Sequence, residues 1–157
     1  MELDNLVTQD TADEGVWTPV TLYGKPADFD LKILGDDSDA VQRYNRKAAK
    51  KLKGVMAKAY KSDETEFDDE TVEDLADSGD EGVLVRIAGI RGWKVERRLI
   101  GTKEISREPE PVTLNGEELK CDEKSYRLLI SKIPAVKEFV LKVSRDRTNF
   151  LSKPGGN

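Results

Sequence analysis

Residues 31–44, LKILGDDSDAVQRY, decide the fold because a strand-like run meets a helix-like run within them. Apolar residues occupy every second position over residues 29–33, and this alternation is typical of a β-strand. A glycine and four polar residues follow. From Val41 onward, apolar residues recur at steps of three and four with basic residues between them. This spacing predicts an amphipathic helix over residues 38–61.

The stretch Asp36-Asp37-Ser38-Asp39 is interpreted as a helix start. An EF-hand loop places acids at positions 1, 3 and 5, a glycine at 6 and a glutamate at 12. Counted from Asp37, the chain has acids at the first two of these positions and Val41 at the third. We expect Asp37 or Ser38 to cap the helix and Asp39 to lie near the positive end of its dipole. No catalytic, metal-binding or cofactor-binding residue is predicted.

Two alternating runs on either side of a turn predict an N-terminal β-hairpin. The runs cover residues 16–23 and 29–34, and the segment between them contains Gly24 and Pro26. Pro19 has no amide hydrogen to donate to a neighbouring strand. We therefore expect the first strand to lie at the edge of its sheet.

The segment between residues 69 and 93 permits two interpretations. Its apolar residues keep helical spacing, which favours a second helix that begins near residue 69 and continues through Ile90. The β-branched content of residues 83–90 makes a strand the competing interpretation. The glycines in this segment would permit a break or a kink.

Three short signals predict the order of the C-terminal elements. Asn115-Gly116 is typical of a hairpin turn, and Asp122 is placed to cap a short helix. Pro134 suits the first turn of a last helix, whose apolar rhythm continues to Phe150.

The predicted fold class is α+β, a mainly helical body with an N-terminal β-hairpin and a second short hairpin before two C-terminal helices. We expect a flexible N-terminal segment over residues 1–15, a single α+β domain over residues 16–151 and a flexible tail over residues 152–157. A chain of 157 residues is long enough for one core of modest size.

The composition favours a binding protein, and we predict that the protein is no enzyme. The chain contains no histidine, which removes the commonest general base and the Ser–His and Cys–His nucleophile systems. The one cysteine, Cys121, is expected to be a small packed residue. The sequence shows no signal-peptide pattern and no apolar run of membrane-spanning length. We therefore expect a soluble cytosolic protein that binds no cofactor and no membrane.

Charges are strongly segregated along the chain, although the net charge is only -5. Residues 42–61 carry eight basic residues and no acid, whereas residues 63–81 carry eleven acids and no base. The basic face could follow nucleic-acid phosphates, be solvated, or pair with the acidic block folded back against it. The candidate partner-binding residues are the basic Arg43, Arg46, Lys47, Lys50 and Lys51 and the aromatic Trp17, Tyr44, Trp93 and Phe150.

Several short motifs occur in an order that resembles a viral protein family. They are a strand running into an acidic helix start, a Gly-Trp pair after an apolar segment, and an Asp-Arg-x-Asn-Phe run near the end. In this chain the motifs are Gly35-Asp37-Ser38-Asp39, Gly92-Trp93 and Asp146-Arg147-Asn149-Phe150. With VWTPV near the start, the chain resembles the tail assembly chaperones of long-tailed bacteriophages over about residues 16–151. It departs from the family at GWKVERRLIGTKEISREPEPV, which replaces a Trp-Ser/Thr-Gly turn.

The resemblance implies a chaperone in the host cytoplasm that binds unassembled tape-measure protein and tail-tube subunits and is absent from the finished particle. Many members of the family also have a longer product made by ribosomal frameshifting. Self-association is a further expectation. Two alternatives stay open. One is a structural virion protein, such as a tail-completion or head–tail connector component, and the other is a nucleic-acid-binding protein that uses the basic helix, which the acidic balance disfavours.

Overall fold

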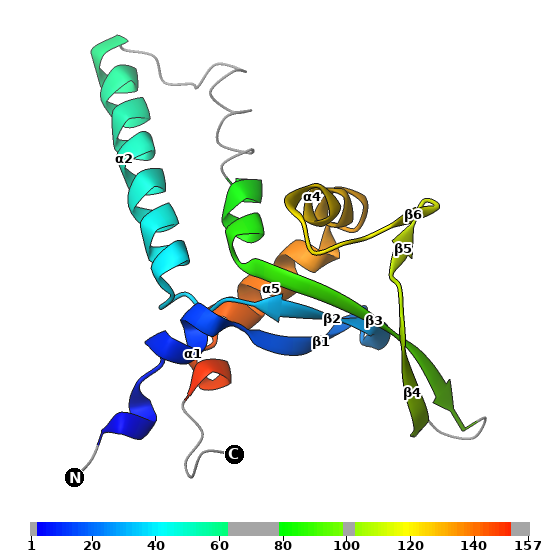
Figure 1. Ribbon diagram of the computed structural model, residues 1–157. Coiled ribbons are helices and arrows are strands. Elements are labelled where there is room, and N and C mark those ends of the chain that lie inside the picture. The colour runs from blue at the N-terminus through cyan, green and yellow to red at the C-terminus, as the bar shows by residue number, and fades with distance from the viewer. Residues whose placement is uncertain (1–2, 63–78, 99–102, 152–157) are drawn as a thin grey trace.

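The computed structural model describes residues 3–62, 79–98 and 103–151. Its centre is an antiparallel sheet in the order β1-β2-β3-β4, with helices α4 and α5 packed near it and α2 standing away from it (Figure 1). The α+β class is therefore confirmed, and the expected N-terminal hairpin extends into a larger sheet. The strands are β1 Val16–Leu22, β2 Lys25–Ile33, β3 Ile87–Arg97 and β4 Glu104–Glu110.

The N-terminal hairpin forms as predicted. Strands β1 and β2 pair with Val16 opposite Ile33, and Tyr23 and Gly24 make the turn with φ angles of 56° and 75°. Positive φ at both central residues is typical of a type I′ turn, whose twist matches that of the strands. Strand β1 lies at the edge of the sheet, which confirms the interpretation of Pro19.

Strand β3 corrects the predicted helix. The chain is helical over residues 79–85 and then extended from Ile87, so the competing strand interpretation holds there. Two glycines permit the close contacts that this strand makes with its neighbours. A Cβ at Gly89 would lie 2.7 Å from the Trp17 side chain, and one at Gly92 would lie 2.4 Å from the Glu110 carbonyl oxygen. The predicted helix start near residue 69 lies outside the described residues.

The core lies between one face of the sheet and the two C-terminal helices, α4 Glu123–Lys132 and α5 Ala135–Arg145. Leu31 and Ile33 of β2 are fully buried, as are Val136 and Val140 of α5. These residues occupy alternate positions of a strand and every fourth position of a helix, as the sequence patterns require. Each such side chain contributes about 1.5–3 kcal/mol by its removal from water.

The second hairpin and its following helix match their sequence signals. Strands β5 Thr113–Leu114 and β6 Glu117–Glu118 flank Asn115 and Gly116, which adopt φ angles of 52° and 79°. The Asp122 carboxylate accepts a hydrogen bond of 2.8 Å from the backbone amide of Ser125, which caps α4. This bond also holds the pKa of Asp122 below its usual range.

The last helix ends earlier than predicted. Helix α5 ends at Arg145, and a separate 3-10 helix, η2 Arg147–Phe150, follows it. Asp146 separates the two because its carboxylate accepts from the backbone amide of Thr148 and caps the second one. Phe150 is only 1% exposed, so it belongs to the packed interior.

Part of the N-terminal segment, which the sequence predicts to be flexible, is helical and contacts the domain. Residues Asp4–Leu6 form the 3-10 helix η1, and Gln9–Glu14 form the helix α1. Ala12 of α1 is fully buried, and its carbonyl oxygen accepts a 3.2 Å hydrogen bond from the Gly35 amide. A Cβ at Gly35 would lie 2.7 Å from that of Ala12, so the two backbones approach closely.

Helix α2, Asp39–Ser62, confirms the predicted amphipathic helix to within one residue at each end. Its first turn is anchored, with Val41 fully buried, whereas Leu52 and Met56 are 45% and 47% exposed. Figure 1 shows α2 projecting from the body of the molecule. Most of the acidic block predicted to pair with α2, residues 63–78, lies outside the described part of the chain. Its described acids pair elsewhere, Asp80 with Lys137 and Glu81 with Arg127. Within the described part, no helix has the length and apolar content needed to cross a membrane.

Candidate partner-binding groove

The acidic stretch at the start of α2 is a structural junction. The Ser38 hydroxyl accepts a 3.3 Å hydrogen bond from the Val41 amide, which confirms the predicted cap. The Asp36 carboxylate accepts from Arg86 Nη2 at 3.1 Å, and the Ser144 hydroxyl lies 3.0 Å from the same oxygen. Arg86 is only 4% exposed. This network joins the start of α2, the start of β3 and the end of α5, and sequence reasoning identified neither Arg86 nor Ser144 as its members.

Asp37 makes a second link at the same junction. Its carboxylate accepts from Arg147 Nε at 2.9 Å and from the Thr8 hydroxyl. The Arg147 hydrogen bonds, followed by the Thr8 hydrogen bond, hold the pKa of Asp37 below its usual range. The GDDSD and DRTNF motifs are therefore in contact, although 110 positions separate Asp37 from Arg147. Both acids stabilise the fold, and among the described residues no group of three acidic or cysteine side chains is placed to hold a metal ion.

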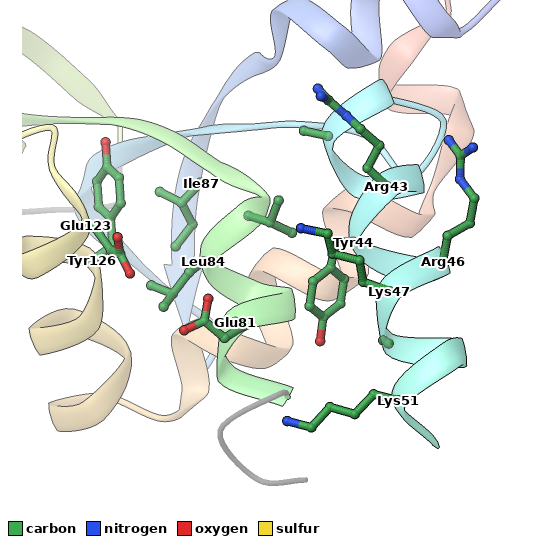
Figure 2. A pocket seen from close by; sticks show the side chains of 13 residues that line it. Arg43, Tyr44, Arg46, Lys47, Lys51, Glu81, Leu84, Ile87, Glu123 and Tyr126 are labelled. Atoms are coloured by element: carbon green, nitrogen blue, oxygen red, sulfur yellow. The ribbon is translucent and has the colours of Figure 1, made fainter. Parts of the chain in front are cut away.

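A groove of about 1040 Å³ lies between α2, the helical residues 79–85 and α4 (Figure 2). Leu84, Ile87 and Tyr126 contribute apolar surface to it, although each is at most 8% exposed. On the α2 side, the ring of Tyr44 lies close to Gly82, where an added Cβ would be 3.0 Å from it. The groove therefore has an apolar floor where α2 meets the rest of the domain.

The two walls of the groove carry opposite charges, and they differ in whether those charges are ion-paired within the protein. Glu81 and Glu123 form the acidic wall, and both are already paired with Arg127; the Arg127 Nη2 to Glu123 Oε1 distance is 2.6 Å. The basic wall belongs to α2. Among the described residues, no carboxylate forms an ion pair with any of its cations, which are Arg43, Arg46, Lys47 and Lys51.

The predicted partner-binding residues divide into four groups. Arg43, Arg46, Lys47, Lys51 and Tyr44 come together along the groove. Lys50 is exposed on α2 but does not line the groove. Phe150 is in the interior, so its predicted role as a surface anchor is wrong. The fourth group, Trp17 and Trp93, lies on the sheet.

The two tryptophans form a separate cluster around Arg91. The Arg91 guanidinium lies 4.3 Å from the centre of the Trp17 ring and 5.3 Å from that of Trp93. Arg91 Nε and Trp93 Nε1 both donate to the Asp30 carboxylate, at 2.8 Å and 3.0 Å. Because Asp30 is 3% exposed and one of its carboxylate oxygens accepts both hydrogen bonds, the cluster stabilises the sheet.

The groove also contains residues that sequence reasoning did not identify as site residues. Leu84 and Tyr126 belong to segments whose apolar spacing indicates burial, and nothing in that spacing shows that they face α2. Cys121 is exposed, which differs from the packed position expected for it, and its sulfur lies 3.4 Å from the Ile90 carbonyl oxygen. Burial, and to a lesser extent Cys121, raises the pKa of the neighbouring Tyr126.

Comparison with protein-family models, curated proteins and solved structures found no match. The resemblance to tail assembly chaperones therefore stays a prediction from short motifs. The groove combines an apolar floor, a wall of two glutamates that share Arg127, and a wall of cations that have no carboxylate partner among the described residues.

Proposed function

We propose that this protein is a bacteriophage tail assembly chaperone that binds tail components before they assemble. The observation that carries this proposal is α2, a helix of 24 residues that projects from the domain with apolar and basic side chains exposed together. Such a surface suits temporary binding to an exposed apolar surface of another protein. The short motifs near Gly35, Trp93 and Arg147 support the choice of family.

In the proposed mechanism, apolar residues make the contact with the client and charged residues set its orientation. The exposed Leu52 and Met56, together with the groove floor, would bury apolar surface of the client. The cations of α2 would set the docking orientation and the rate of encounter, and exposed charges of this kind weaken as salt rises. Binding that combines apolar burial with exposed charge pairs is reversible. A chaperone needs reversible binding because its client must finally enter the tail.

The proposed partners are the tape-measure protein and the tail-tube subunit, and the proposed location is the host cytoplasm. The chaperone would cover polymerising surfaces of these clients until assembly begins. It would act by binding and not by catalysis, and it would be absent from mature particles.

Co-expression with each proposed client tests this function. The full chain is co-expressed separately with the tape-measure protein and with the tube protein of the same phage, and complexes are captured at about 50 and 300 mM salt. We expect capture of at least one client, more of it in the soluble fraction, and weaker capture at the higher salt. Purified particles provide the control, since the chaperone should be missing from them.

Two results would reject the proposal. One is failure to capture either client together with a fixed copy number of this chain in purified particles, which would identify a structural virion protein. The other is retention of the chain on duplex DNA with a steep salt dependence while neither client is captured, which would identify a nucleic-acid-binding protein.

A further inference from the structure

We propose that the groove beside α2 binds an acidic amphipathic helix of the client. The inference rests on the proposed function for its biological setting, but it concerns a site that can be tested without any phage protein. Its starting point is the difference between the two walls of the groove, which are lined by Lys47 and Lys51 on one side and by Glu81 and Glu123 on the other (Figure 2).

The charge requirement of the occupant follows from that difference. The carboxylates of Glu81 and Glu123 share one cation, Arg127, so this wall keeps a single net negative charge. On the α2 side, Arg43 Nε and Arg46 Nε donate to backbone carbonyl oxygens of their own helix, at 3.4 Å and 3.3 Å. These bonds leave the positive charges without a carboxylate partner among the described residues. A complementary occupant therefore presents carboxylates to α2.

The apolar requirement follows from the floor. Leu84, Ile87 and Tyr126 line the groove but are almost fully buried. The accessible part of the apolar floor comes from lining residues of intermediate burial, which are Ala40, Tyr44, Ala48 and Val85. A purely acidic ligand, such as a nucleic-acid strand, would leave this floor without an apolar partner. An occupant that also buries a row of apolar side chains uses both features of the groove.

The size of the groove suits a helical segment. A helix about 10 Å across and two turns long occupies roughly 850 Å³, and the groove holds about 1040 Å³. In a helix, residues three and four positions apart share a face, so an apolar row can meet the floor while carboxylates on its flank meet Lys47 and Lys51. Helix-in-groove recognition of this kind needs only the residues that the groove already provides.

The test uses a designed peptide probe and the full chain. The probe is a fluorescent 16-residue helical peptide with leucines at i, i+3, i+4 and i+7 and glutamates along one flank. One matched peptide replaces the glutamates with lysines, and another replaces the leucines with serines. We expect the acidic amphipathic peptide to bind, measured by fluorescence anisotropy, at least tenfold more tightly than either matched peptide.

Charge reversals on α2 locate the binding site. The K47E/K51E variant removes two cations of the groove, whereas K50E/K53E makes the same change of net charge on exposed residues of the same helix that do not line it. We expect at least a tenfold loss of probe affinity in the first variant and less than a threefold change in the second. Ala48→Trp, which fills the groove without changing charge, should also lose at least tenfold. Circular dichroism checks that all variants remain folded.

Several results would overturn the inference. Equal losses in K47E/K51E and K50E/K53E would show that only net charge matters, and equal binding of the glutamate and lysine peptides would remove the charge argument. Displacement of the probe by single-stranded DNA at lower concentration would assign the groove to phosphates. Dimerisation that Ala48→Trp abolishes would assign it to a second copy. Tighter probe binding after neutralisation of the acids in residues 63–78 would assign it to the chain's own acidic stretch.

The two proposals fail separately. If the designed peptide binds in the groove but neither tail protein is captured in co-expression, the groove inference stands and the chaperone function is rejected. If a tail protein is captured equally by wild type and by K47E/K51E, the chaperone function stands and the groove inference is rejected.

Discussion

The junction at the start of α2 and the groove beside the same helix use charge in opposite ways. At the junction, Asp36 and Asp37 each accept hydrogen bonds from an arginine and a hydroxyl group. In the groove, the cations of α2 have no carboxylate partner within the described residues. The acids just before α2 are thus already paired, whereas the groove cations on α2 have no carboxylate partner among the described residues. The comparison indicates which charges maintain the fold and which can serve a partner.

The largest expected effect is at the buried arginine of the junction. Arg86→Met leaves the Asp36 carboxylate and the Ser144 hydroxyl without their shared cation. Breaking a fully buried pair on one side costs about 3–5 kcal/mol. Asp36 is 27% exposed and keeps its Ser144 hydrogen bond, so the free energy of unfolding should fall by about 3 kcal/mol or somewhat less in urea titrations. The matched variant Arg43→Met, on the exposed part of α2, should change it by about 0.5 kcal/mol or less. Similar losses in both variants would remove the distinction between the two regions.

A pair of glycine substitutions sharpens the comparison with a smaller effect. Gly35→Ala places a methyl group 2.7 Å from Ala12 Cβ and 3.0 Å from the Phe150 ring, and overpacking of this kind costs about 1–3 kcal/mol. Gly54→Ala lies within α2 and meets nothing within 4 Å. It should stabilise the protein by about 0.5–1 kcal/mol, because alanine favours the helix. Thermal unfolding should therefore show shifts of opposite sign, and a destabilising Gly54→Ala would mean that α2 is more closely packed than described.

The smallest effect concerns the pH dependence of the Asp37–Arg147 link. Arg147 holds the pKa of Asp37 below its ordinary value of 3.8, so the ionised carboxylate stabilises the folded state. That contribution is complete above about pH 4 and is lost as the pH falls through the lower folded-state pKa. Because Arg147 is largely exposed, Asp37→Asn should cost about 0–1 kcal/mol at pH 7. The difference from wild type should shrink below pH 4, and a difference that grew there would contradict the assignment.

Local signals in the sequence predicted the features that depend on neighbouring residues. The Ser38 cap, the Asn115-Gly116 turn and the Asp122 cap all formed, because each is decided within a few residues. The segment around Ile90 has apolar spacing that fits a helix, but β2 was available to pair with it, so it became a strand. Pairing across the sheet depends on residues far away in the chain, which a local pattern does not include.

The candidate site was predictable on only one of its sides. The basic face of α2 is visible in the sequence as a run of cations without acids, and Arg43, Lys47 and Lys51 do line the groove. The opposite wall comes from segments about 40 and 80 positions further along the chain, and the sharing of Arg127 by its two glutamates depends on the folded structure. Phe150 was misassigned because its aromatic side chain suggested a surface anchor, although it continues the apolar rhythm of the last helix and lies in the interior.

Site-specific photo-crosslinking would test the central claim, that a client docks in the groove through the available charges of α2. Benzoylphenylalanine is placed at Lys47 inside the groove, at Lys50 on the same helix outside it, or at Ile105 on β4, and the chain is co-expressed with the tape-measure and tube proteins. We predict a crosslinked client from position 47, with several-fold less from position 50 and none from position 105. Crosslinking that is equal or stronger from position 50 or position 105 would contradict the account.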